Sequence, residues 1–232
     1  MNLLGIDTST LRAALALERH DGVRFISTSL PGRRHGRDLV PSIRDLLGLA
    51  GLHAADLTTI GVGIGPGSYT GLRVGIMAAK TLAYATGASL HSLDSLEFFA
   101  RAAATSSPWV SVLSDAQRGD FHVADFFRIE SAAPLLRQGP VRIASQDELV
   151  VQWDADRIVV GPGLLKWQGD WPSGLVASPE ADDPDPGLLL EMLKDASREG
   201  RQEDVWGLEP LYLRRSAAED QWTPRPRPNP AK

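Results

Sequence analysis

The spacing of apolar residues divides the chain into two halves with the same order of elements. Alternating and β-branched runs predict strands, and apolar residues three and four positions apart predict helices. The first half reads as three strands, a helix, a strand, a helix, a strand and a helix, at 2–6, 11–17, 23–29, 37–50, 59–64, 69–86, 89–92 and 95–103. Polar turns between the first three strands are typical of an antiparallel meander.

The second half repeats this order after the polar sequence Thr105-Ser106-Ser107-Pro108, which is typical of a boundary. Its elements are predicted at 109–113, 121–129, 141–144, 146–153, 157–160, 164–168, 175–178 and 186–198. Each half opens with a strand that ends at a small acidic turn, and each contains an apolar strand that runs into Gly-Pro-Gly. The pattern predicts an α/β protein of two ribonuclease-H-like lobes with mixed sheets, at 1–104 and 105–215, and a disordered proline-rich tail at 216–232.

The stretch 59–87 predicts a buried strand, a Gly-Pro-Gly turn and a long helix with Ser68 as its N-cap. This helix has two apolar stripes, one of Leu72, Ile76, Ala79 and Ala83 and one of Val74, Ala78, Leu82 and Ala85. A helix that is apolar on two sides needs two surfaces to bury against. One is the sheet of its own lobe, and the other is either a second protein chain or more of the same domain.

Composition and charge restrict the class of protein. The 232 residues are 43% hydrophobic and 23% charged, as in soluble globular proteins. The formal net charge of −5 argues against a general nucleic-acid-binding surface, and the lack of cysteine excludes disulfides and thiolate chemistry. The N-terminus has no basic region of a signal peptide, and no apolar run approaches the roughly 20 residues of a membrane span. We therefore expect a cytoplasmic protein without membrane contact.

The sequence offers few catalytic groups. None of the five histidines lies within one helical turn of another, so no histidine pair has metal-ligand spacing, and each is expected at or near the surface. There is no P-loop, GxGxxG or GxSxG motif. Two interpretations stay open for the polar residues at the first turn and the helix start, namely Asp7, Thr8, Ser68, Tyr69, Thr70 and Gly71. They either contact an anion or nucleotide, or only cap their own turns.

Six blocks of sequence occur in order along most of the chain: GIDTST, HGRDLVPSI, GPGSYTGLRVG, SLDSLEFFA, SDAQRGDFH and PLYLR. The block GPGSYTGLRVG at 65–75 is the most specific of them. Together the blocks resemble the bacterial TsaB (YeaZ) family. The fifth block departs from the family's usual DARRGEVY-like run at Gln117 and Phe121-His122, which argues against a nucleotide or tRNA contact from that loop.

The resemblance implies an actin-like (ASKHA) fold and a role in forming threonylcarbamoyladenosine at the tRNA adenosine next to the anticodon. In that pathway a TsaD-like subunit is the catalyst and carries the ATP and metal sites, and a TsaE-like ATPase is a further partner. A TsaB-like subunit is a degenerate paralogue that binds TsaD. The resemblance therefore implies a non-catalytic scaffold and activator with no cofactor or metal of its own, which contacts tRNA only through the complex. It argues against the peptidase activity that the older M22 glycoprotease name suggests.

Members of this family dock through helices of the first lobe. Carried onto this chain, the resemblance implies an interface of Leu39, Ile43, Leu46, Leu47, Leu72, Arg73, Ile76, Ala79 and Ala83. Without the partner, the same face is expected to pair two copies as a homodimer. The alternative function is a stand-alone actin-like ATP-dependent kinase or hydrolase that uses Asp7, Thr8 and the turn at 65–71. Arg33, Arg34 and Arg37 either contact tRNA phosphates or form a solvated loop.

Overall fold

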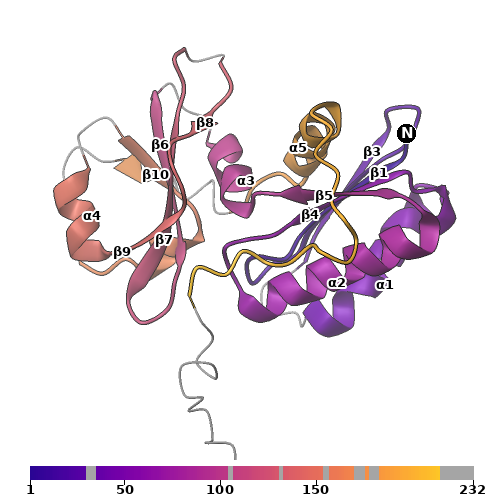
Figure 1. The fold of residues 1–232 in the computed structure, drawn as a ribbon, viewed down its shortest axis with the longest axis horizontal. Coiled ribbons are helices and arrows are strands. Elements are labelled where there is room, and N and C mark those ends of the chain that lie inside the picture. The colour runs from indigo at the N-terminus through magenta and orange to yellow at the C-terminus, as the bar shows by residue number, and fades with distance from the viewer. Residues whose placement is uncertain are drawn as a thin grey trace, which may run out of the picture.

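The computed structural model describes residues 1–29, 35–103, 107–130, 133–153, 157–169, 176–177 and 183–214. Two mixed β-sheets, each flanked by helices, stand side by side (Figure 1). Arg33 and Arg34, the boundary at 105–106 and the proline-rich tail lie outside the described residues, so these predictions stay predictions.

The first sheet has the strand order β3-β2-β1-β4-β5. Its strands are β1 (Leu3–Asp7), β2 (Ala14–Glu18), β3 (Arg24–Thr28), β4 (Thr59–Gly63) and β5 (Ser89–Leu93). The first three strands pair antiparallel, as predicted, and β4 and β5 extend the sheet in parallel with β1. Helices α1 (His35–Leu49) and α2 (Tyr69–Thr86) cover one face, and α5 (Gly187–Arg198) covers the other (Figure 1).

The second sheet has the order β11-β10-β6-β7-β8, and β9 also pairs with β7. Its strands are β6 (Trp109–Asp115), β7 (Asp120–Phe127), β8 (Leu136–Arg137), β9 (Arg142–Ser145), β10 (Arg157–Val160) and β11 (Val176–Ala177). Here too an antiparallel pair, β6 and β7, is extended by parallel strands. The repeated order confirms the prediction of two ribonuclease-H-like lobes.

Helices α3 (Ser95–Ala102) and α5 pack at positions that the order of elements along the sequence does not predict. α5 belongs to the predicted second lobe, 105–215, yet Leu190 is buried against Leu3 and Ala16 of the first sheet. α3 lies between the sheets, because Phe99 joins the second-lobe core while Phe98 packs with α5. The two lobes therefore share elements on their facing sides.

Local sequence signals set the ends of several elements as predicted. The Ser68 hydroxyl accepts a hydrogen bond from the Gly71 N–H at 3.1 Å and caps α2, and Gly87 ends that helix with a left-handed φ of 74°. Ser145 and Glu148 form the predicted capping box of α4 (Gln146–Gln152). The helix predicted at 164–168 is instead the 3-10 helix η2 (Pro162–Lys166). The sequence pattern predicts neither β8 nor the short η1 (Ala54–Asp56), because such short elements show no period.

Candidate functional site

The acidic turn after β1 packs into the start of α2. Asp7, Thr8 and Ser9 have exposed fractions of only 3%, 0% and 5%. The Thr8 hydroxyl donates to the Gly71 carbonyl oxygen at 2.8 Å, and the Ser68 N–H donates to the Ser9 carbonyl oxygen at 2.6 Å. The polar groups of the turn and of the helix start are therefore hydrogen-bonded to one another.

Two glycines permit this close approach. A methyl group added at Gly71 would lie 2.1 Å from the Thr8 carbonyl oxygen, and one at Gly75 would lie 2.2 Å from the Thr8 hydroxyl oxygen. Gly71 and Gly75 are four residues apart on α2, so they face the same side of the helix. The glycine pattern of GPGSYTGLRVG thus makes room for the chain's own turn.

The Asp7 carboxylate is enclosed by the protein. It accepts hydrogen bonds from the Ser9 N–H at 2.8 Å, from the Ser9 hydroxyl at 2.6 Å and from the Ser95 hydroxyl at 2.6 Å. Burial raises the pKa of Asp7 above its ordinary value, and the hydrogen bonds from Ser9 and Ser95 oppose that shift. These contacts match the interpretation of Asp7 and Thr8 as a capped turn, and contact with a nucleotide stays a prediction.

Two N–H groups at the start of α2 that were considered for an anion are bonded within the protein. The N–H of Ser68 is bonded to Ser9, and the N–H of Gly71 is bonded to the Ser68 hydroxyl. The side chains of Tyr69 and Thr70 are exposed. The contacts at this helix start are those of a tight turn, which was the other interpretation of the motif.

The eight apolar residues predicted for the partner interface are buried inside the chain. Leu39, Ile43, Leu46, Leu47, Leu72, Ile76, Ala79 and Ala83 have exposed fractions between 0% and 6%. Seven of them belong to the core cluster that also contains the strand residues Leu4 and Ile60. The prediction that these side chains form the docking surface is therefore wrong, because a helix turns its strongest apolar stripe toward its own sheet.

The second stripe of α2 also serves the same lobe. Val74, Ala78 and Leu82 are partly buried against the first-lobe core, and α1 and α2 pack against each other. The two apolar sides of α2 thus match the alternative of a helix packed within one domain. Only Arg73 among the predicted interface residues is exposed.

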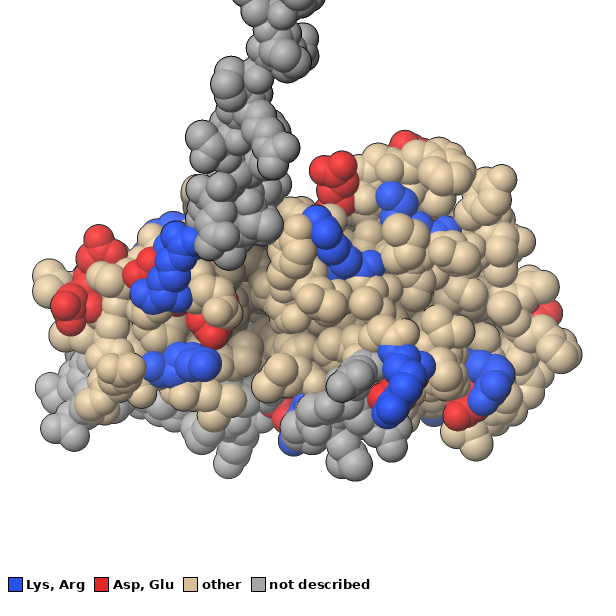
Figure 2. Space-filling model, turned by 90° about the horizontal axis from the view of Figure 1, so that it is seen from below, with Lys and Arg blue, Asp and Glu red and all other residues tan. Residues whose placement is uncertain are grey.

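A different set of apolar residues is exposed on α1, on α2 and on the segment that follows α5. Val40, Met77, Tyr84 and Trp206 have exposed fractions of 66%, 64%, 69% and 72%, and we call these four residues the outer helix face. The rings of Tyr84 and Trp206 contact each other, with centroids 5.2 Å apart. Figure 2 views the molecule from below and shows a mostly uncharged surface with scattered Lys, Arg, Asp and Glu.

Sequence reasoning missed the outer helix face because its members lie off the main apolar stripes. Met77 and Tyr84 are seven residues apart, which places them on one side of α2, but Trp206 comes from a distant segment. Next to them, Arg73 donates to the Tyr212 hydroxyl at 2.8 Å and lies over the Tyr69 ring, 4.1 Å from its centroid.

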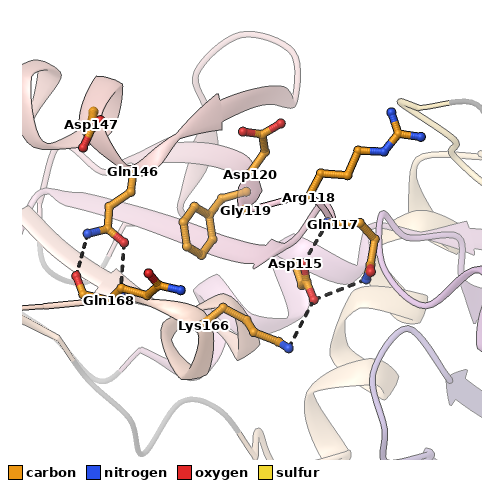
Figure 3. A pocket seen from close by; sticks show the side chains of 10 residues that line it. Asp115, Gln117, Arg118, Gly119, Asp120, Gln146, Asp147, Lys166 and Gln168 are labelled. Carbon is orange, nitrogen blue, oxygen red and sulfur yellow. Dashed lines mark hydrogen bonds and ion pairs between the residues drawn. The ribbon is translucent and has the colours of Figure 1, made fainter.

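A polar cavity of about 400 Å³ lies in the second lobe beside the β6–β7 loop (Figure 3). It is lined by Asp115, Gln117, Arg118, Gly119, Asp120, Phe121, Gln146, Asp147, Lys166 and Gln168. Asp115 accepts a hydrogen bond from the Gln117 N–H at 2.7 Å, and the Lys166 ammonium lies 3.9 Å from the Asp115 carboxylate. Gln117 and Arg118 have left-handed φ angles of 65° and 61°. None of these residues was among the predicted sites, since their proximity arises from β7, α4 and η2 together.

The prediction that each histidine is a surface or lightly buried residue is wrong for two of the five, which are buried. His91 is 3% exposed, with Nδ1 2.7 Å from the Arg201 carbonyl oxygen. His122 is 7% exposed, with Nδ1 3.2 Å from the Ser114 hydroxyl. Burial, together with the positive charge of Arg214, lowers the pKa of His122 to about 4. His122 is thus neutral at pH 7.

Within the described ranges, no three His, Asp or Glu side chains come together in a way that could hold a metal ion. Among the helices of those same ranges, none is long and apolar enough to cross a lipid bilayer.

Comparison with known proteins gives consistent results. Residues 26–136 match the family model described as TsaD, tRNA N6-adenosine threonylcarbamoyltransferase. The tRNA threonylcarbamoyladenosine biosynthesis protein TsaB of Bacillus subtilis is 28% identical, with 96% of this chain and 98% of that protein aligned. Its namesake in Escherichia coli is 29% identical, with 94% and 96% aligned.

A solved structure agrees over nearly the same length. The crystal structure of a Pseudomonas aeruginosa protein with similarity to peptidase YEAZ has a TM-score of 0.77 and 27% identity, and it covers 92% of this chain and 99% of that one. Full-length sequence matches and the shared two-lobe fold lead to one conclusion: the chain belongs to the TsaB (YeaZ) family.

Proposed function

We propose that this chain is a non-catalytic scaffold and activator subunit that binds a TsaD-like threonylcarbamoyltransferase. Family membership supports a role in threonylcarbamoyladenosine biosynthesis, and in this proposal the modified adenosine is the one next to the anticodon of the tRNA. In this proposal ATP and metal are held by the TsaD-like partner, a TsaE-like ATPase joins the complex, and tRNA is contacted only through it. The complex acts in the cytoplasm.

The outer helix face is the observation that carries the proposal. Val40, Met77, Tyr84 and Trp206 expose large apolar side chains on neighbouring elements of one lobe. Aromatic residues and methionine are enriched in protein interfaces, and contiguous exposed apolar patches commonly mark them. We infer that this face, rather than the buried stripes of α1 and α2, contacts the partner, and that it pairs two copies when the partner is absent.

The interior of the first lobe supports a non-catalytic role. The Asp7 carboxylate is surrounded by Ser9 and Ser95 and is nearly inaccessible. The Thr8 hydroxyl is bonded to Gly71 inside the lobe. The turn that would have to meet a nucleotide is instead used to fasten β1 to α2.

The test is binding and activation of the TsaD-like subunit by the purified chain and by two variants. Met77→Glu places a charge on the outer helix face and should weaken binding at least tenfold, because the carboxylate loses its water when the interface closes. Val151→Glu is the matched control, because Val151 is 86% exposed on α4 of the other lobe. It should bind and restore tRNA modification in a depleted strain like the wild type. Equal binding by both variants would contradict the proposed face.

The stand-alone kinase or hydrolase makes a different prediction. Calorimetric titration of the isolated chain with ATP and magnesium should give no tight binding and no turnover if the scaffold proposal is correct. Saturable binding with hydrolysis by the lone chain would favour the enzyme.

A further inference from the structure

After α5, residues 199–214 run without a regular helix or strand from the first lobe toward the second (Figure 1). We call this segment the strap. Its backbone is fastened to the first sheet, because the Glu203 N–H donates to the Leu90 carbonyl oxygen and the Leu211 N–H donates to the Ile64 carbonyl oxygen, both at 2.8 Å. The strap is therefore an integral part of the fold rather than a loose end.

The strap also contributes side chains to both lobes. Leu208 is 6% exposed and belongs to the first-lobe core. Leu211 and Leu213 are partly buried against the second-lobe core. A displacement of the strap would therefore be felt in both cores, since packed interiors transmit strain.

Arg214, the last described residue of the strap, forms hydrogen bonds to the β6–β7 loop. One guanidinium nitrogen donates to the carbonyl oxygens of Ala116 and Gln117, each at 3.1 Å, and the other donates to the Asp120 carboxylate at 2.5 Å. The planar fork of arginine suits this three-point contact. Gln117 and the next residue, Arg118, are held in the left-handed region, a conformation that persists only where surrounding contacts enforce it.

The β6–β7 loop, to which Arg214 is hydrogen-bonded, forms one wall of the polar cavity. Gln117, Arg118, Gly119 and Asp120 are four of its ten lining residues. The position of Arg214 therefore affects the shape of the cavity, although Arg214 itself does not line it.

The outward side of the strap contributes Trp206 to the outer helix face, and Tyr212 of the strap lies next to that face. Trp206 packs on Tyr84, and the Lys80 ammonium donates to the carbonyl oxygens of Trp206 and Leu208 at 3.0 and 3.1 Å. Tyr212, which lies two residues before Arg214 in the strap, accepts a hydrogen bond from Arg73 of α2. A protein that docks on α2 would meet the strap directly.

We propose that the strap couples docking on the outer helix face to the conformation of the cavity loop, with Arg214 as the positioning residue. The inference rests on the proposed function for the identity of the docking partner, a TsaD-like subunit. Contacts of the partner with Trp206 and Tyr212 restrict the strap. A restricted strap keeps Arg214 on the loop for a larger fraction of time, so docking on one lobe stabilises the cavity wall on the other.

Hydrogen exchange of the loop amides tests the coupling in the full chain. In the free Arg214→Ala variant, exchange at residues 117–120 should be about tenfold faster than in the wild type, while exchange in α2 stays unchanged. Addition of the TsaD-like subunit should slow loop exchange several-fold in the wild type and leave it unchanged in Arg214→Ala. Arg198→Ala is the matched control, since Arg198 is an ion-paired arginine on α5, and it should behave like the wild type.

A conservative variant keeps the test informative if Arg214→Ala folds poorly. Arg214→Lys retains the charge but not the forked donors, so its loop should exchange at an intermediate rate. Failure of the wild type to bind the partner would overturn the proposed function and the coupling with it. Binding with no change in loop exchange would overturn the coupling alone. Equal loop exchange in wild type, Arg214→Lys and Arg214→Ala would show that Arg214 does not position the loop.

Discussion

At the scale of single residues, the contact between Thr8 and α2 explains the glycine spacing of the most specific sequence block. We expect Gly75→Ala to destabilise the protein by about 2 kcal/mol, because the new methyl group forces α2 away from the turn. This occurs although alanine is intrinsically the better helix former. Urea denaturation measures the difference.

The control for this substitution is Gly48→Ala in α1, where an added methyl group meets no atom within 4 Å. Helix propensity alone should then stabilise the protein by up to about 1 kcal/mol. If Gly75→Ala were also stabilising, the close contact with Thr8 would not constrain this position.

His122 gives a residue-scale prediction about pH. Its native pKa of about 4 lies below the ordinary value of about 6.5, so the unfolded chain binds the extra proton more readily. The resulting stability is fully present above pH 6.5 and is lost as the pH falls toward 4, by about 3 kcal/mol in total. His122→Gln does not titrate in this range. Its unfolding free energy should therefore fall less between pH 7 and pH 4, as urea denaturation at each pH can show. Parallel curves for the two proteins would contradict a neutral buried histidine.

At the scale of elements, neighbouring residues of α2 separate the core from the outer surface. Ile76 is 4% exposed and Met77 is 64% exposed. We expect Ile76→Glu to destabilise the lobe by about 4 kcal/mol or more, since it buries a charge without a partner. At a protein concentration where the chain is monomeric, Met77→Glu should change the unfolding free energy by about 0.5 kcal/mol or less, because no second copy then adds to the stability. Thermal and urea unfolding distinguish the two; similar losses would mean that both sides of the helix are packed in the isolated chain.

This difference corrects the use of apolar stripes as interface markers. The stripe of Leu72, Ile76, Ala79 and Ala83 is buried inside the lobe. The weaker stripe of Val74, Ala78 and Leu82 packs against the core to which α1 also contributes. An interface on α2 must use the remaining side, where isolated residues such as Met77 and Tyr84 give no period to detect in the sequence.

At the scale of the whole molecule, α3, α5 and the strap join the lobes. Arg137 of β8 is ion-paired with Asp94, the N-cap of α3, and Arg101 of α3 pairs with Asp195 of α5 at 2.8 Å. We therefore expect both lobes to unfold in one calorimetric transition, with equal calorimetric and van't Hoff enthalpies. Two resolved transitions would show that each lobe is an independent folding unit.

The sequence by itself determined the order of the longer elements, several helix caps and the duplicated ribonuclease-H-like plan. These depend on local periodicity and on short-range hydrogen bonds such as those of Ser68 and Ser145. Its motif blocks also identified the family.

Only the tertiary structure decided which side of α1 and α2 is exposed, that α5 returns to the first sheet and that Arg214 reaches the β6–β7 loop. It also placed Asp7 against Ser95 and Thr8 against Gly71, where the sequence left their partners open. The physical reason is that burial depends on contacts between residues distant in sequence. An apolar or polar pattern states that a side chain needs a partner, but not where that partner lies.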